Sequence, residues 1–317
     1  MQTVRLGRTQ AQVSVTGLGC GGHSRLGMAR GADAREAARL VRHALDLGVN
    51  FIDTAPAYRT EEAVGLGVAG RRDTVFLSTK VGPNMGGPAR GGEPISAGQL
   101  TENLEASLRR LGTDYVDVLH LHGVQPGEYA YCAEVLVPEM QRQQKAGKIR
   151  FLGITEQFIP DTAHAMLPQA LRDDLFDVVM VGFNMINPSA RRSVFPLTLA
   201  QDTGTLVMFA VRRQLSDAAA LKQVVAGLIG RGEVDADEID ADDPLGFVRD
   251  SAGVGSIVEA GYRFCRHEPG AQVVLTGTGS LEHLQANLAA IQAPPLPAEV
   301  RTRLAQLFGA VDSVSGN

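Results

Sequence analysis

The sequence predicts one (β/α)8 barrel with a short N-terminal hairpin and an additional C-terminal helix. Short apolar segments alternate with helical periodicity, which is typical of parallel strands joined by right-handed crossovers. Eight strand segments can be counted, and 317 residues is an ordinary length for such a barrel. A doubly wound fold is disfavoured, because the glycines of residues 17–22 have the wrong spacing for a dinucleotide fingerprint. We therefore expect residues 1–317 to form one barrel domain.

The position of each element follows from local patterns of apolar residues and turn formers. Residues 3–7 and 11–19 form the expected hairpin, whose second arm continues as TGLGCGG, the first barrel strand. The other barrel strands are expected at 50–54, 74–80, 115–122, 148–155, 177–183, 205–211 and 271–277. Helices are expected at 34–47, 61–69, 97–111, 133–146, 160–172, 188–202, 254–267, 280–291 and 297–310. Residues 212–253 are expected to form a long irregular section.

Composition and charge exclude several classes of protein. Hydrophobic residues make up 44% of the chain and charged residues 21%, which is typical of a folded globular protein. The formal net charge of −5 gives no reason to expect nucleic-acid binding, and no apolar run reaches the length of a membrane helix. The three cysteines are few and widely spaced, so we expect no disulfide framework and no metal site. Without an apolar signal segment at the N-terminus, a cytoplasmic location is expected.

One segment departs from the average composition. Residues 233–243 carry seven acidic side chains in eleven positions. A solvated surface loop is the favoured interpretation of such a charge block. A calcium-binding loop is disfavoured, because Ile239 occupies a position that requires an oxygen ligand and the central glycine is missing.

Four polar residues follow three consecutive strands of the predicted barrel. Asp53 lies at the end of NFIDT, and Tyr58 follows in the next loop. Lys80 ends TVFLSTK, and His122 ends YVDVLHLH. Active sites of these barrels form at the C-terminal ends of the strands, so the four side chains are expected at one rim. His120 points to the same side of its strand but is expected one layer deeper.

This set of residue types is suited to the reduction of a carbonyl group. Hydride addition to a carbonyl carbon leaves an alkoxide, and the Tyr58 phenol can donate the proton that neutralises it. Lys80 would lower the pKa of Tyr58 from its usual value of about 10, and Asp53 would provide the counter-charge. His122 would hydrogen-bond the carbonyl oxygen. Each residue alone has a purely structural interpretation, but their joint position at one rim favours catalysis.

These residues resemble the aldo-keto reductase family over nearly the whole chain. The resemblance is carried by VRLGRTQAQVSVTGLGCGG, GVNFIDTAPAYRTEEAVG, TVFLSTKVG, LGTDYVDVLHLH, KIRFLGIT and VVLTGTGSLEHLQANLAA. The catalytic aspartate, tyrosine, lysine and histidine of the family correspond to Asp53, Tyr58, Lys80 and His122. The resemblance implies a barrel that binds NADP(H) or NAD(H) across its mouth and reduces an aldehyde or ketone. Arg59 departs from the family pattern, in which a glycine commonly follows the tyrosine.

The resemblance also implies a set of cofactor-binding residues. A Ser-Asn pair that binds the carboxamide in the family is replaced here by Thr155 and Glu156, and Asn184 is expected nearby. After the seventh strand, the segment with Phe209, Arg212 and Arg213 is expected to contact the nicotinamide or the pyrophosphate. The remaining expected contacts are Gly22, Gly277, Thr278, Gly279, Ser280, His283 and Asn287. Relatives with a strong preference for NADP carry lysine and arginine at the positions of Gly277 and His283, so the 2′-phosphate would bind less tightly here.

Three other functions remain open at this point. The same residues would serve an NAD(P)-dependent sugar dehydrogenase that works in the oxidative direction. A non-catalytic cofactor-binding subunit and a lyase that uses Lys80 as a Schiff base are disfavoured by the complete set of four residues. Specificity for a small carbonyl or sugar substrate is expected from residues 81–96, 123–132 and 212–253, with Met85, Tyr129 and Tyr131 as candidate pocket walls.

Overall fold

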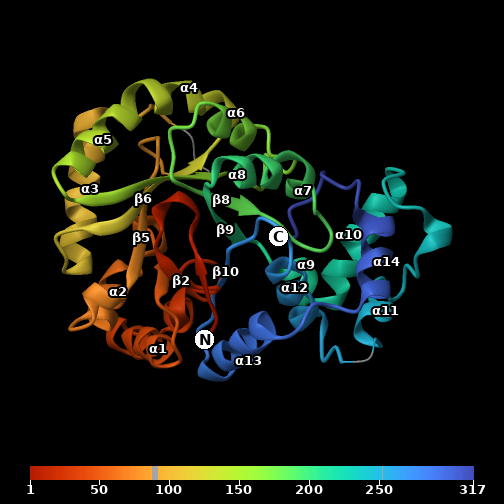
Figure 1. Ribbon diagram of the computed structural model, residues 1–317. Coiled ribbons are helices and arrows are strands. Elements are labelled where there is room, and N and C mark those ends of the chain that lie inside the picture. The colour runs from red at the N-terminus through yellow and green to blue at the C-terminus, as the bar shows by residue number, and fades with distance from the viewer. Residues whose placement is uncertain (88–91, 252) are drawn as a thin grey trace.

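Eight parallel strands close into a barrel, which confirms the predicted (β/α)8 architecture (Figure 1). The computed structural model describes residues 1–87, 92–251 and 253–317. Neighbouring strands follow chain order, and the last strand pairs with the first. The barrel strands are β3 (Thr16–Gly19), β4 (Phe51–Asp53), β5 (Phe76–Val81), β6 (Val116–Val124), β7 (Ile149–Glu156), β8 (Val178–Gly182), β9 (Gly204–Met208) and β10 (Val273–Thr276).

The N-terminal hairpin covers one end of the barrel. Its arms β1 (Thr3–Arg5) and β2 (Gln12–Ser14) pair antiparallel. The segment 11–19, expected as one continuous arm, is divided in the structure into β2 and the barrel strand β3. Leu6 and Val13 are fully buried and belong to the apolar cluster inside the barrel, together with Phe51. Because the hairpin covers this end, access to the interior is left at the opposite end, where the strands terminate.

The barrel interior changes from apolar to polar along the strands. Phe51 and Phe76 stack with ring centroids 5.5 Å apart, in the apolar layer that also contains the hairpin residues Leu6 and Val13. Two residues further along β4, the inward-facing position is occupied by Asp53, because successive side chains of a strand alternate between faces. His120 pairs in register with Gly153, where an added Cβ would lie only 2.3 Å from the imidazole. The glycine therefore provides the space that the histidine ring fills.

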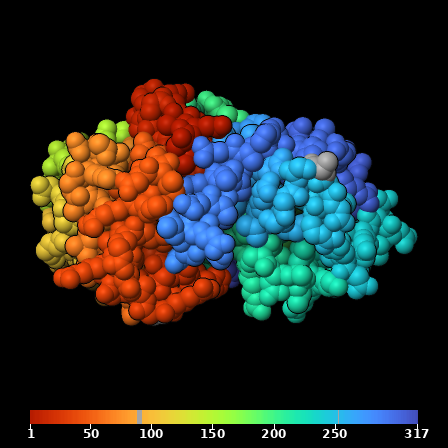
Figure 2. All heavy atoms as spheres, turned by 90° about the horizontal axis from the view of Figure 1, so that it is seen from below, coloured from red at the N-terminus to blue at the C-terminus, as the bar shows by residue number. Residues whose placement is uncertain are grey.

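Helices surround the barrel, and the first of them, α1, meets α13, which follows the last barrel strand. α1 begins at a capping box formed by Asp33 and Glu36, and α13 lies against α1 (Figure 2). The helices that match predicted segments are α1 (Ala34–Asp46), α2 (Glu61–Val68), α3 (Ala97–Leu111), α5 (Val137–Lys145), α6 (Met166–Arg172), α7 (Ala190–Ser193), α8 (Phe195–Gln201), α12 (Ile257–Arg266), α13 (Leu281–Gln292) and α14 (Ala298–Phe308). In the described part of the chain, no helix combines the length and apolar character needed to cross a membrane.

The prediction of an irregular section at 212–253 is wrong for much of its length. It contains α9 (Arg213–Ser216), α10 (Ala218–Gly230) and α11 (Gly246–Arg249). Asp217 caps α10 by accepting hydrogen bonds from two backbone N–H groups, and α10 buries one face. Glycines within α10 weaken the helical signal of its sequence. The acidic segment 233–243 is largely exposed, as predicted.

Three predicted helices have different bounds in the structure. The helix expected at 160–172 begins only at Met166, and the helix expected at 188–202 is divided into α7 and α8. The helix expected at 133–146 begins earlier, as α4 (Tyr129–Tyr131) followed by a π-helical turn (Cys132–Leu136). Residues 88–91 of the predicted specificity loop 81–96, and residue 252 of the section 212–253, lie outside the described residues.

Candidate active site

The structure brings together the four polar residues that the sequence singled out. Lys80 extends from β5 with its Nζ 2.6 Å from each carboxylate oxygen of Asp53, which ends β4. The same ammonium donates to the Thr54 carbonyl oxygen at 2.9 Å, and the Ser78 hydroxyl donates to Asp53 at 2.9 Å. Lys80 is 1% exposed and Asp53 is 3% exposed. The two charges therefore form a buried ion pair whose remaining hydrogen-bonding capacity is largely satisfied.

Tyr58 lies directly beside this ion pair. Its hydroxyl is 3.3 Å from Nε2 of His122, and the two rings meet edge to face. The Lys80 ammonium lies 5.0 Å from the centroid of the tyrosine ring. Tyr58 ends a short 3-10 turn, and the next residue, Arg59, has a φ of +60°. Glycine adopts this left-handed conformation freely, whereas arginine occupies it at some cost in strain.

Burial is the largest influence on the pKa values of Tyr58 and His122. Burial raises the pKa of Tyr58, and the Lys80 ammonium opposes this rise without reversing it. The expectation that Lys80 would bring the pKa of Tyr58 below its usual value is therefore wrong in overall direction, because desolvation of the phenolate is the larger effect. Burial also lowers the pKa of His122 far below its usual range, and Lys80 adds to this effect. His122 is consequently a neutral imidazole at neutral pH.

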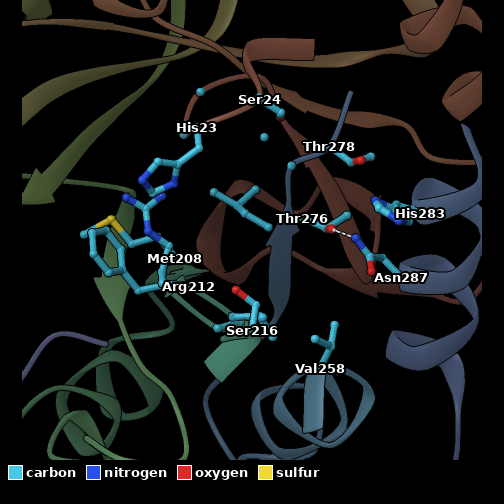
Figure 3. A pocket seen from close by; sticks show the side chains of 18 of the residues that line it. His23, Ser24, Met208, Arg212, Ser216, Val258, Thr276, Thr278, His283 and Asn287 are labelled. Atoms are coloured by element: carbon cyan, nitrogen blue, oxygen red, sulfur yellow. Dashed lines mark hydrogen bonds between the residues drawn. The ribbon is translucent and has the colours of Figure 1, made fainter. Parts of the chain in front are cut away.

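A cavity of about 800 Å³ opens at this end of the barrel (Figure 3). Its floor includes Asp53 and Tyr58, and it extends to the loop between β10 and α13. Ten of the expected cofactor-binding residues line it: Gly22, Phe209, Arg212, Arg213, Gly277, Thr278, Gly279, Ser280, His283 and Asn287. Ser280 caps α13 by accepting from the His283 backbone N–H, so the helix begins at the cavity wall. Asn287 donates a hydrogen bond to Thr276 at 2.9 Å.

The two other expected cofactor contacts do not line this cavity. The Thr155 hydroxyl accepts a hydrogen bond from the Gly123 N–H at 2.7 Å. The Asn184 amide donates to the carbonyl oxygens of Phe209 and Ser315, and its oxygen accepts two backbone N–H groups. Both side chains are buried and already hydrogen-bonded. Their contact with a carboxamide stays a prediction that requires rearrangement of these bonds.

Glu156, the departure from the Ser-Asn pair, has a structural partner that the sequence did not reveal. Its carboxylate lies 2.9 Å from Nδ1 of His164 and accepts the Gly182 N–H at 2.7 Å. Both Glu156 and His164 are fully buried. Burial raises the pKa of Glu156, and His164 opposes that rise. The carboxylate is thus engaged by the loop after β7.

Sequence reasoning missed part of the cavity wall, and three residues that it proposed as pocket walls do not line this cavity. His23, Ser24 and Arg30 line the cavity from the loop after β3, which carries no recognisable motif. Its clustered glycines, with Gly22 and Gly27 at positive φ, were the available signal of a special backbone. The candidate pocket walls Tyr129 and Tyr131 instead donate hydrogen bonds to Asp173 and to the Ile95 carbonyl oxygen, respectively. Met85 is 62% exposed and does not line the cavity either.

Comparisons with known proteins agree with this architecture. The sequence pattern of the Aldo/keto reductase family matches residues 18–308. The oxidoreductase YqkF of Bacillus subtilis is 25% identical over 304 residues, covering 94% of each chain. L-galactose dehydrogenase of Arabidopsis thaliana is 35% identical over 157 residues, covering 47% of each chain. The holo form of an aldo-keto reductase from Bacillus halodurans superimposes with a TM-score of 0.71 at 25% identity, covering 98% of this chain and 97% of that one.

The fold and its open, polar end define a class: oxidoreductases built on a (β/α)8 barrel that use a nicotinamide cofactor on carbonyl compounds. The match spans most of the barrel, from β3 to the end of α14. The chain belongs to the aldo/keto reductase family. In the described residues, no group of three histidine, cysteine or acidic side chains is arranged to hold a metal ion.

The buried ion pair yields a stability prediction. Lys80→Met leaves the Asp53 carboxylate buried without its counter-charge, so we expect a loss of about 3–5 kcal/mol in the free energy of unfolding. Adding Asp53→Asn should restore at least half of that loss, because no buried charge then remains. Urea unfolding of both variants measures this, with the exposed Lys145→Met as the control that changes stability little. Equal stability of the single and double variants would contradict the pairing.

The burial of His120 leads us to predict that the stability of the protein depends on pH. Burial lowers the pKa of this fully buried imidazole well below its usual range, with Lys80 and His122 adding to the effect. Below a pH of about 6.5 the unfolded chain binds a proton that the folded chain excludes, so stability falls as the pH falls. We expect this residue to contribute up to about 1.4 kcal/mol per pH unit, a contribution that His120→Met abolishes. Unfolding curves between pH 7.5 and 5 measure it; an unchanged slope in the variant is the contrary result.

Proposed function

We propose that the protein reduces an aldehyde or ketone to an alcohol with NADPH or NADH, and that Tyr58 donates the proton. The observation that carries this proposal is the contact between the Tyr58 hydroxyl and His122 beside the buried Lys80–Asp53 pair. A phenol next to a neutral imidazole, at the floor of a cavity of about 800 Å³, is arranged to meet a carbonyl oxygen. A small molecule is the substrate we expect, since the Tyr58 side chain lines this cavity.

Each of the four residues has a distinct role in this proposal. The Tyr58 hydroxyl transfers its proton to the oxygen that becomes an alkoxide, and the neutral His122 ring hydrogen-bonds the same oxygen and orients it. Although burial lowers the pKa of Lys80, the nearby Asp53 carboxylate and Tyr58 raise it overall, so the ammonium stays charged. Its charge stabilises the phenolate left after proton transfer. Asp53 holds the ammonium in position.

The residues that line the rest of the cavity fit a dinucleotide. An added Cβ at Gly277 would lie 2.8 Å from the Gly19 carbonyl oxygen, and one at Gly279 would lie 2.6 Å from Gly27 Cα. These glycines let two backbone loops meet beside the start of α13, where N–H groups can bind phosphate. Arg212 provides a cation on the opposite wall. When bound, the cofactor supplies the hydride.

We expect the preference for NADP over NAD to be weaker in this protein than in relatives that are specific for NADP. Gly277 and His283 stand where those relatives have lysine and arginine, so a 2′-phosphate lacks a bidentate partner here. Because the chain has no tryptophan, titration with NADPH and with NADH is followed by the fluorescence of the reduced nicotinamide, which measures both affinities. We expect binding of both forms with dissociation constants within about tenfold of each other, corresponding to roughly 1.4 kcal/mol.

A sugar dehydrogenase is the second candidate function. The observation that favours it is the 35% identity to L-galactose dehydrogenase over 157 residues. The same residues would operate in reverse, with the Tyr58 phenolate accepting the hydroxyl proton. A panel of aldehydes, ketones and sugars, assayed with reduced and oxidised cofactor, separates the two functions.

A role as a channel subunit is disfavoured by the complete set of four residues. It is suggested by 34% identity over 128 residues to a probable potassium channel beta subunit of Arabidopsis thaliana.

Substitution of the proton donor tests the proposed mechanism. Tyr58→Phe should fold and bind cofactor normally, but its kcat for carbonyl reduction should fall by about 10²–10⁴-fold, because general acid catalysis is lost. Tyr131→Phe is the matched control, since that hydroxyl donates to the Ile95 carbonyl oxygen outside the cavity. A Tyr58→Phe enzyme with more than half of the original kcat would falsify the assignment.

A further inference from the structure

Arg212 is a half-buried cation that faces the cavity, and no acidic side chain of the described residues pairs with it. It lines the cavity, and its guanidinium carbon lies 4.3 Å from the centroid of the Phe209 ring. Within residues 1–87, 92–251 and 253–317, it forms no ion pair with an acidic side chain. Burial lowers the pKa of Arg212, and Tyr58 acts in the opposite direction. A positive charge held in this way favours an anionic oxygen group as its ligand.

One edge of this guanidinium is fixed by a neutral side chain. Nε and Nη2 both donate to the Asn317 carboxamide oxygen, at 3.1 and 2.8 Å. Nη1 is not bonded to any acceptor in the described chain, and it lies 3.3 Å from the position of a Cβ added at Gly22. Arg212 therefore reaches from the β9 side of the barrel toward the loop after β3, which also carries His23 (Figure 3).

Asn317 is itself held by a chain of backbone contacts at the barrel mouth. The carbonyl oxygens of Val314 and Ser315 accept hydrogen bonds from Asn187 and Asn184, at 2.7 and 3.1 Å. Gln214 N–H donates to the Gly316 carbonyl oxygen at 3.1 Å, and its side-chain amide donates to the main-chain oxygen of Asn317 at 3.0 Å. Residues 314–317 thus lie between the loop after β8 and the start of α9 (Figure 1).

The backbone at Phe209 supports the same arrangement. Phe209 has a φ of +64°, a conformation that is strained for an aromatic residue. Its carbonyl oxygen accepts from Asn184, the same side chain that binds Ser315. The ring under the guanidinium and the segment that fixes the guanidinium edge are therefore anchored by one buried asparagine.

We propose that Asn317 is a positioning residue that presents Arg212 to an anionic oxygen group bound between Nη1 and the Gly22 loop. This inference rests on the proposed function, because the anion is either the diphosphate of the dinucleotide or an anionic substituent of the carbonyl substrate. The Asn317 side chain is a carboxamide, so its two hydrogen bonds to the guanidinium bring no charge with them. Asn317→Asp would keep the hydrogen bonds and cancel the charge of Arg212, so its effect separates the position of the guanidinium from its charge.

Three variants of the full chain test this proposal. Asn317→Ala removes the anchor of Arg212, and Asn317→Asp neutralises it. Ser313→Ala is the matched control, because Ser313 bonds Glu233 and Arg231 in the same tail but does not touch Arg212. The readouts are the midpoint of thermal unfolding with and without inorganic pyrophosphate, the dissociation constants of NADH and NADPH, and KM against kcat for benzaldehyde and 4-carboxybenzaldehyde.

If the diphosphate is the ligand, both Asn317 variants weaken dinucleotide binding about tenfold, equivalent to roughly 1.4 kcal/mol, and reduce the stabilisation by pyrophosphate. If the anion belongs to the substrate, KM rises for the carboxylated aldehyde alone. In either case the effect is larger on KM or the dissociation constant than on kcat, and Ser313→Ala shows none of it.

The proposal is overturned if the Asn317 variants match Ser313→Ala in every binding measurement. It is also overturned if Asn317→Asp binds anions as tightly as the unmodified protein. A protein that reduces no carbonyl compound with either dinucleotide would refute the proposed function, whereas the pyrophosphate measurement would still test the anion site.

Discussion

The ion pair between Lys80 and Asp53 is the constraint on which the rest of the site depends. Two charges are removed from water at the open end of the barrel, and such a pair is tolerated only when its hydrogen bonds are satisfied. Ser78 and the Thr54 carbonyl oxygen provide that satisfaction, so the ammonium has one position. Tyr58 lies against this fixed charge, and its hydroxyl contacts His122. The geometry of the phenol is thus set by residues on three neighbouring strands.

The barrel confines this polar layer to one end. The hairpin buries Leu6 and Val13 against the interior cluster, and the stacked Phe51 and Phe76 form an apolar layer above it. Beyond that layer, the polar side chains of Asp53 and Tyr58 line the cavity at the open end of the barrel. The low dielectric of this layer raises the pKa of Tyr58, and the Lys80 ammonium limits that rise. The proton affinity of the phenol is therefore set by its buried position.

The parts of the structure that depend on strand periodicity could be predicted from the sequence. Parallel strands bring their C-terminal ends together, so the positions of Asp53, Lys80 and His122 followed from counting along each strand. Contacts set by tertiary packing could not be predicted. Glu156 has the same chemistry as a ligand-binding carboxylate, and only the fold reveals His164 as its partner.

Prediction from local helix propensity failed where tertiary packing stabilises a helix whose sequence disfavours it. α10 contains two glycines, which weaken the helical pattern, yet burial of one face and the Asp217 cap stabilise the helix. The link between Arg212 and Asn317 joins residues separated by 105 positions, and neither belongs to a recognisable motif. Long-range contacts of this kind leave no periodic signal in the sequence.

The central claim is that the Lys80 charge opposes the effect of burial on the ionisation of Tyr58. The most direct test is the pH dependence of kcat for carbonyl reduction in the unmodified enzyme and in Lys80→Met. Reduction requires the protonated phenol, so activity declines above the pKa of Tyr58 in the working complex. Loss of the ammonium should move that decline at least about one unit toward higher pH and lower the maximal rate. An alkaline limb that stays in place, with the rate near its original value, would contradict the account.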